Sequence, residues 1–240
     1  MNGLYAIFVF LVGIGAGFVQ RVSGFGLGIF SMIFFPHFLP VQAGPVICSI
    51  HSCTISSFNA VRYRKYVHYR TALPMMVAAL LTVPLTVRFA KDVSADIFRV
   101  LLGIVLILFS LYFLLLKSKI RIKPTVRNGF LVGILGGVLN GLFSTGGPPV
   151  VLYLNTAMPD KTMYFATIQF YFAFTNLLAT IMRIVNGMVT PEILFYTAVG
   201  VVSCLIGNRI GRIVFDKLDA DKLKQIIYIG MIISGILMFL

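Results

Sequence analysis

Long apolar stretches separated by short polar segments run through most of the 240-residue chain. A helix needs about 20 apolar residues to cross a bilayer, so a run of that length predicts a transmembrane helix. Two further regions, residues 4–39 and 130–157, are apolar but interrupted by polar residues and glycines. We expect each of them to form two short helices that meet at a break. The stretches predicted to span the membrane are residues 41–61, 71–90, 97–116, 163–185, 191–207 and 223–240.

The clearest break lies in the segment FSTGGPPVVLYLNTAMP, residues 143–159. Pro148 and Pro149 have no backbone N–H and clash with a preceding helical turn, while Gly146 and Gly147 add backbone freedom. A regular helix therefore cannot continue through this segment. Backbone that leaves a helix inside a bilayer must be buried in protein or line a water-filled cavity. The break is accordingly a candidate ligand site.

The two interrupted regions resemble each other and predict an internal repeat. VGIGAGFVQRVSGFGLG, residues 12–28, aligns with VGILGGVLNGLFSTGGP, residues 132–148, and pairs Gln20 with Asn140. The predicted fold class is an all-α polytopic membrane protein with two inverted repeats, residues 1–118 and 129–240. Each repeat is expected to be a broken or re-entrant helical hairpin followed by three transmembrane helices. A basic cytoplasmic linker is predicted at residues 119–128.

The distribution of basic residues predicts the orientation. The chain has 20 Lys and Arg against 7 Asp and Glu, and Lys and Arg concentrate in cytoplasmic loops. If each hairpin enters and leaves on one side, residues 62–70, 117–127 and 209–224 fall together with Lys161 and hold 15 of the basic residues. We therefore expect these loops in the cytoplasm and both termini outside. The basic residues expected on the other side are Arg88, Lys91, Arg99 and Arg183.

Composition excludes several classes of protein. Charged residues make up 11% of the chain, against about 25% in a soluble domain. The basic loops account for the positive charge, so we expect the lipid bilayer and no nucleic acid as a partner. Cys48, His51 and Cys53 are close in sequence, but their spacing does not converge on one metal ion. No metal or cofactor is expected, and the cysteines are interpreted as small buried residues, with a membrane redox protein as the alternative.

The N-terminal segment lacks a basic start and a small-residue cleavage site. We therefore expect it to remain in the mature protein rather than to act as a signal peptide.

Paired broken helices in repeated halves point to a transporter site. A helix that begins at a break directs unbonded N–H groups and the positive end of its dipole toward it, which favours an anion. The acidic residues all lie in loops or at segment ends, which argues against a cation site in the membrane. A small anion is therefore the expected ligand. The residues predicted to bind it are Gln20, Arg21, Ser23, Gly24, Gly26, His51, Asn140, Ser144, Thr145, Gly146, Gly147 and Gln169.

Some of these residues have a second interpretation. Arg21 either pairs with the anion or extends to the membrane surface. His51 is either a hydrogen-bonded packing residue or a ligand or proton-carrying group, and Gln169 is its counterpart in the second repeat. Other glycines are interpreted as close helix contacts: Gly13, Gly15, Gly17, Gly133, Gly136 and Gly137.

The two hairpin segments also resemble a known family. GILGGVLNGLFSTGGPPVVLYL in the second half and GIGAGFVQRVSGFGLGIF in the first look like the TauE/SafE family of membrane anion permeases. Family members often carry a G-x-G-G-G run in these hairpins, where this chain has SGFG at residues 23–26 and GGPP at residues 146–149. The resemblance covers nearly the whole chain.

The resemblance implies a bacterial inner-membrane transporter, and not an enzyme, for a sulfur oxyanion or organosulfonate such as sulfite or sulfoacetate. We expect alternating access, with the anion held between the two hairpins. Transport of small organic carboxylates and a passive anion channel are the alternatives. The direction of transport, the coupling ion and the formation of a homodimer stay open.

Overall fold

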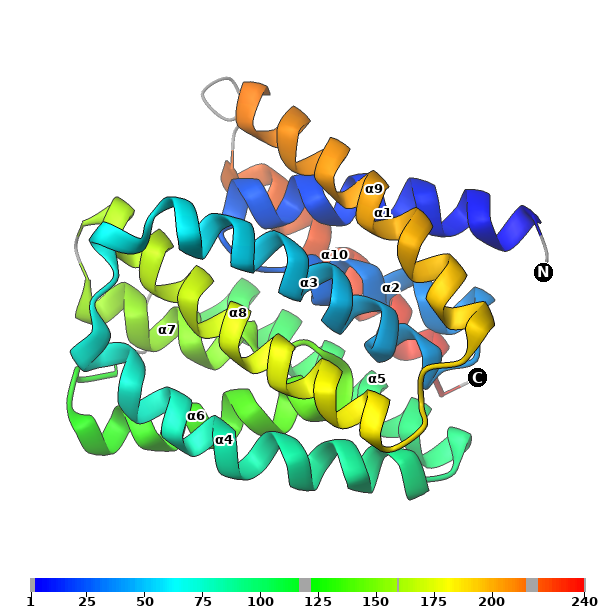
Figure 1. Cartoon of the computed structure of the whole chain (residues 1–240), viewed down its shortest axis with the longest axis horizontal. Helices are drawn as coiled ribbons and strands as arrows, with labels where there is room; N and C mark the ends of the chain where they lie inside the picture. The colour runs from blue at the N-terminus through cyan, green and yellow to red at the C-terminus, as the bar shows by residue number, and fades with distance from the viewer. Residues whose placement is uncertain (1–2, 117–121, 159, 215–219, 240) are drawn as a thin grey trace.

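The computed structural model describes residues 3–116, 122–158, 160–214 and 220–239, which form helices joined by short connections, with no strand among them (Figure 1). The predicted all-α fold class is thus confirmed. Part of the predicted basic linker, residues 119–121, lies outside the described residues. The helices are α1 (Gly3–Ser23), α2 (Leu27–Phe38), α3 (Ala43–Arg62), η1 (Arg64–Tyr66), α4 (Tyr69–Asp92), α5 (Ala95–Leu111), η2 (Tyr112–Leu116), α6 (Val126–Phe143), α7 (Gly147–Ala157), α8 (Lys161–Val185), α9 (Pro191–Val214) and α10 (Ala220–Leu237).

Within the described residues, six helices are long and apolar enough to cross a membrane. Four of them coincide with uninterrupted stretches predicted from the sequence, and the other two are α1 and α6. The helix expected at residues 41–61 does form, as α3, but it is not one of the six. It carries buried polar side chains, including His51 and Asn59. The apolar part of α10, Gln225–Leu237, is shorter than a full span.

Each interrupted region forms a hairpin with unequal arms, so the expectation of two short helices was wrong. The first arms, α1 and α6, have 21 and 18 residues and are among the candidate spans. The second arms, α2 and α7, have 12 and 11 residues. At 1.5 Å per residue they are only about 16–18 Å long, roughly half a bilayer. If α2 and α7 each end at the membrane surface, they begin near the middle of the bilayer. The breaks before them therefore lie deep inside the bundle.

The helices of the two halves pack in a matching pattern. Helix α1 packs along α9, and its counterpart α6 packs along α4. The equivalent helices α3 and α8 pack on each other, as do α5 and α10. Tyr63, at the end of α3, contacts Phe165 near the start of α8, so these two helices are antiparallel (Figure 1). Antiparallel equivalents are what the predicted inverted repeats require.

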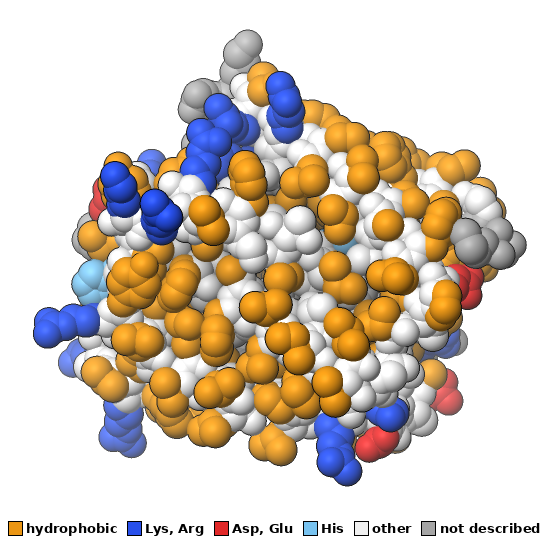
Figure 2. All heavy atoms as spheres, in the orientation of Figure 1, with side chains coloured by type: hydrophobic (Ala, Val, Ile, Leu, Met, Phe, Trp, Pro, Cys, Tyr) orange, Lys and Arg blue, Asp and Glu red, His pale blue; other side chains and the backbone are white. Residues whose placement is uncertain are grey.

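Charge is distributed unevenly between the two ends of the bundle. Figure 2 shows Lys and Arg side chains gathered at the end where α3 ends and α4 and α8 begin, on the left. Acidic side chains, with fewer basic ones, lie at the opposite end, and hydrophobic side chains cover the face between them. Large apolar residues such as Leu85 and Leu115 are about two-thirds exposed or more, as expected of a protein whose surface contacts lipid.

Glycines allow the closest helix contacts, as predicted. A Cβ on Gly17 of α1 would overlap the backbone carbonyl of Cys204 in α9. A Cβ on Gly133 of α6 would overlap the backbone carbonyl of Met75 in α4. Backbone cannot move aside as a flexible side chain can, so these two contacts fix how the long hairpin arms sit against their neighbours.

Alanine at Gly17 or Gly133 should lower the melting temperature of the protein in detergent. Overpacking of this kind costs about 1–3 kcal/mol. Gly230→Ala is the matched control, because the nearest atom to a Cβ there lies at 3.6 Å, an ordinary contact. Equal melting temperatures for Gly17→Ala and Gly230→Ala would show that the α1–α9 contact is looser than described.

Candidate functional site

The tips of the two hairpins meet in the interior of the bundle. Gly28, in the first turn of α2, packs directly on the backbone carbonyl of Ser144, in the break between α6 and α7. A small pocket with a volume of about 20 Å³ lies at this junction. We call it the central pocket. Its lining residues are Gln20, Gly26, Leu27, Gly28, Ile29, Ser52, Asn140, Ser144, Thr145, Gly146, Gly147, Phe172 and Asn176.

The first tip is built from glycines and one amide. Gly24 and Gly26 have φ values of 77° and 100°, which glycine adopts without steric cost, and they reverse the chain between α1 and α2. The Gln20 side chain then caps the new helix, because its Oε1 accepts the Leu27 N–H at 3.2 Å. The sequence thus supplies both the turn and a partner for one N–H at the start of α2.

The second tip, between α6 and α7, is built from a serine and two prolines. Ser144 has a φ of 57°, and its N–H bonds back to the Asn140 carbonyl at 3.0 Å, which ends α6. Pro148 and Pro149 then stand in the first turn of α7. Proline fits there, but it has no N–H to donate. The start of α7 therefore offers a ligand fewer backbone donors than an ordinary helix start does, so side chains must supply more of the binding.

Three buried polar atoms on residues that line the central pocket have no hydrogen-bond partner within the part of the chain that the structure describes. They are the amide nitrogen Nδ2 of Asn140, the hydroxyl of Thr145 and the amide oxygen Oδ1 of Asn176. Leaving a buried polar group unpaired costs about 1–3 kcal/mol, so such groups usually have a partner. Two of the three can donate a hydrogen bond, which suits the oxygens of an anion.

Arg183 lies directly behind this pocket. The sequence placed it among the basic residues of the outer side and did not predict that its side chain would be buried, at 1% exposed. It reaches inward from near the end of α8 and donates to the Ser144 hydroxyl at 3.0 Å and to the carbonyls of Asn140 and Gly141 at 3.3 and 2.9 Å. These carbonyls belong to the last turn of α6, the negative end of its dipole. Every partner is neutral, so a full positive charge is buried one residue away from the pocket.

A chain of amide side chains leads from the central pocket toward the basic end of the bundle. Gln20 donates to the Gln169 Oε1 at 3.4 Å, and Asn59 donates to the same oxygen at 3.3 Å. The Gln169 amide in turn donates to the Gly24 carbonyl at 2.7 Å, which ties α8 to the first tip. Gln169 therefore lies between the pocket and Asn59, as a bridge rather than a lining residue.

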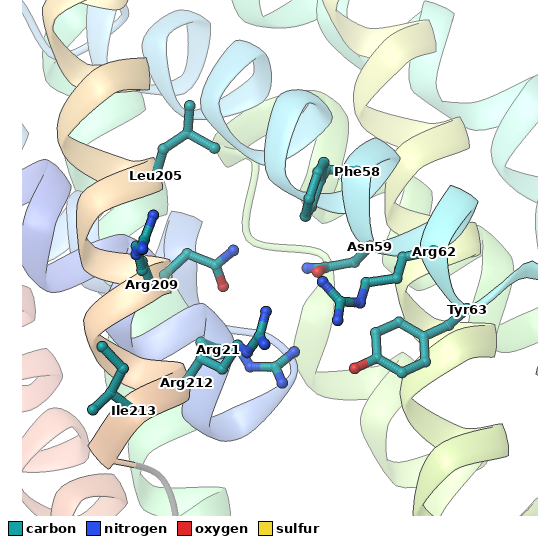
Figure 3. Close-up of a pocket in the computed structure, with 10 residues that line it drawn as sticks. Arg21, Phe58, Asn59, Arg62, Tyr63, Leu205, Arg209, Arg212 and Ile213 are labelled. Atoms are coloured by element: carbon teal, nitrogen blue, oxygen red, sulfur yellow. The ribbon is translucent and has the colours of Figure 1, made fainter.

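Asn59 also lines a larger cavity of about 540 Å³ that opens at the basic end (Figure 3). Its residues come from α1, α3 and α9 and include Arg21, Arg62, Arg209 and Arg212. At the other end of the bundle, a separate cavity of about 620 Å³ is lined by residues that include Gln42, Lys91 and Glu192. Both cavities are much larger than the central pocket.

The structure brings most of the predicted site residues to one place. Those that line the central pocket are Gln20, Gly26, Asn140, Ser144, Thr145, Gly146 and Gly147. Those that lie elsewhere are Arg21, Ser23, Gly24, His51 and Gln169.

Two of the residues outside the pocket are held by bonds of their own. The Ser23 hydroxyl bonds to the carbonyls of Val19 and Phe25 and so serves the turn itself. The His51 Nε2 donates to the Thr197 carbonyl in α9 at 3.1 Å, and the His51 ring packs on Gly200. A ring nitrogen that faces a carbonyl carries the proton, so His51 joins α3 to α9 as a packing residue would.

The sequence did not predict four residues at or beside the central pocket: Ser52, Phe172, Asn176 and Arg183. A signal for two of them was present, because Gln169, Asn176 and Arg183 are spaced seven residues apart on α8. Seven residues are close to two helical turns, so the three side chains share one face.

Sequence comparison identifies the protein's relatives. The sequence model of the family described as "Sulfite exporter TauE/SafE" matches residues 9–238. The chain belongs to the TauE/SafE family. A curated relative from Cupriavidus necator, named "Probable sulfite/organosulfonate exporter TauE", is 22% identical over 205 residues, which cover 83% of this chain and 80% of the relative. No solved structure matches the chain.

Membership confirms the resemblance seen in the two hairpin segments and, with the six apolar helices, makes this TauE/SafE protein a multi-pass membrane protein of a transporter family. Within the described residues, no group of His, Cys, Asp or Glu side chains could hold a metal ion. Cys48 and Cys204 are buried free thiols.

A double-mutant cycle tests whether Arg183 and Ser144 act together. Arg183→Gln should destabilise the protein strongly, because it leaves the Ser144 hydroxyl and two helix-end carbonyls short of a donor. Ser144→Ala added to it should cost less than it does alone, with a coupling energy of about 0.5–3 kcal/mol. Unfolding in denaturant measures the cycle, and the exposed Arg88→Gln is the control for loss of charge. Additive effects would contradict the assigned contact.

Proposed function

We propose that this TauE/SafE protein is an alternating-access permease for a sulfur oxyanion or organosulfonate, such as sulfite or sulfoacetate. The observation that carries the proposal is the central pocket, where two repeat-related breaks meet around unpartnered polar atoms. The family description and the name of the Cupriavidus necator relative support the substrate class.

Electrostatics favours an anion in this pocket. Its lining residues include no carboxylate, and Arg183 sits behind Ser144 with neutral partners only. A buried charge without a counter-charge is costly, and an anion in the adjacent pocket would offset part of that cost. The two donors, on Asn140 and Thr145, are positioned to bind its oxygens directly. The Ser144 hydroxyl is already shared between Arg183 and the Pro45 carbonyl, so its role is to transmit the field of Arg183.

The size of the pocket favours a carrier over an open channel. A volume of about 20 Å³ holds roughly one water molecule, too little for a sulfur oxyanion with four heavy atoms. The tips must therefore separate to admit the substrate. The larger cavities at the two ends would then connect to the pocket in turn, as the halves of an inverted repeat rock against each other.

We further propose that the basic end faces the cytoplasm of a bacterium and that both termini lie on the other side. This orientation follows from the positive-inside rule applied to the end that Figure 2 shows to be rich in Lys and Arg. The cavity lined by arginines would then face the compartment from which an exporter takes its substrate.

Thr145→Val tests the binding site, because it removes one unpartnered hydroxyl while keeping the shape of the side chain. A hydrogen bond to a charged group contributes about 1.5–3 kcal/mol, so the apparent affinity should fall roughly tenfold to hundredfold. Uptake of labelled sulfite and sulfoacetate by proteoliposomes measures this, with acetate as the test of carboxylate transport.

Thr54→Val is the matched control, since the Thr54 hydroxyl bonds within its own helix and does not line the pocket. Unchanged transport by well-folded Thr145→Val would remove the site assignment. Transport of acetate in preference to sulfite would replace the substrate class.

A further inference from the structure

The cavity at the basic end concentrates positive charge from three helices. Arg21 comes from α1, Arg62 from α3, and Arg209 and Arg212 from α9. Figure 3 shows the side chains of Arg21, Arg62 and Arg212 directed into the same space. We call this cavity the arginine vestibule.

Among the described residues, those that line the arginine vestibule include no carboxylate. The others are Phe58, Asn59, Tyr63, Leu205, Asn208 and Ile213, which are all neutral. Arg21 lies over the Phe165 ring, with its guanidinium carbon 5.3 Å from the ring centroid, and the ring attracts the cation without carrying a net negative charge. Clustered like charges in a cleft repel one another and raise the local concentration of anions.

The positive-inside rule requires basic residues at the cytoplasmic end, but it does not require them to surround one cavity. Exposed Arg64 and Arg70 satisfy that rule at the same end without lining the cavity. The four arginines instead surround a volume of about 540 Å³, large enough for a hydrated oxyanion. Guanidinium groups bind the oxygens of such anions in pairs, which suits sulfite and sulfonate as well as phosphate.

The vestibule also leads to the central pocket. Asn59 lines the vestibule and Ser52 lines the pocket, seven residues apart on the same face of α3. Seven residues of helix are about 10 Å long. The amides of Asn59, Gln169 and Gln20 fill the space between with hydrogen bonds of 3.3 and 3.4 Å, at the long end of the normal range. An anion could replace these weak contacts as it moves inward.

We infer that the arginine vestibule is a second anion site, which holds the transported sulfur oxyanion or sulfonate before it enters the central pocket. This inference rests on the proposed function. Loading through this site would raise the local concentration of the anion at the basic end, beside the central pocket.

Calorimetric titration of the full chain in lipid-free detergent with sulfite tests the inference. Wild-type protein should bind two anions, one of them strongly weakened by salt because it depends on exposed charges. Arg62→Gln combined with Arg212→Gln should remove the salt-sensitive site and keep the other. Thr145→Val should do the reverse, so the two sites can be assigned separately.

The charge-matched control is Arg64→Gln combined with Arg70→Gln, which removes two exposed arginines from the same end outside the vestibule. It should leave both sites intact. If the two double variants behave alike, or if wild type binds a single anion that only Thr145→Val weakens, the vestibule site is overturned while the proposed function stands. If no anion binds to the wild type, or if Thr145→Val changes neither site, the proposed function fails first.

A lipid headgroup offers the same phosphate-like chemistry, and a separate titration distinguishes it. Phosphatidylglycerol added to the detergent should leave sulfite binding at the vestibule intact. Two results together would assign the cavity to lipid and overturn the inference. Phosphatidylglycerol would displace sulfite, and the Arg62→Gln, Arg212→Gln variant would transport sulfite as fast as wild type in phosphatidylcholine vesicles.

Discussion

Two helices that stop inside an apolar bundle impose the constraint on which the rest of this structure depends. Each break frees backbone groups that have no water to bond, so the protein must supply partners for them. At the first tip, the Gln20 amide caps the start of α2. At the second, Arg183 bonds to the final carbonyls of α6 and to Ser144. The groups that satisfy the breaks are also the groups that make the site polar and positive.

In the proposed function, the same arrangement lets the site bind an anion with little charge in the membrane-embedded part. One buried arginine would act through Ser144, and neutral amides and hydroxyls would supply the direct contacts. Neutral groups can pair with one another when the pocket is closed, as Gln20, Gln169 and Asn59 do. They can then exchange those bonds for bonds to a ligand. Buried ion pairs would be costly to separate, so they would oppose movement of the hairpin tips.

The sequence predicted the location of both breaks, the first from polar residues and glycines at residues 20–28 and the second from the glycine and proline pairs at residues 146–149. It also predicted that Gln20, Asn140 and Thr145 would share one site, because the repeat paired Gln20 with Asn140 and Thr145 lies in the second break. Arg183 was missed because a position near the end of a span suggests the membrane surface, while its long side chain turns inward to the end of α6. Ser23 and His51 could not be placed either, because their bonds depend on a local turn and on the neighbouring helix α9.

The central claim is that the pocket between the two tips binds the transported anion. A crystal structure with selenite tests it most directly, because selenite is a heavier relative of sulfite and its selenium atom is located by anomalous scattering. The expected result is a selenium peak in the central pocket, with selenite oxygens within hydrogen-bond distance of Asn140 or Thr145 and the tips farther apart than around the pocket of about 20 Å³. A pocket that stays closed and empty at saturating selenite would contradict it.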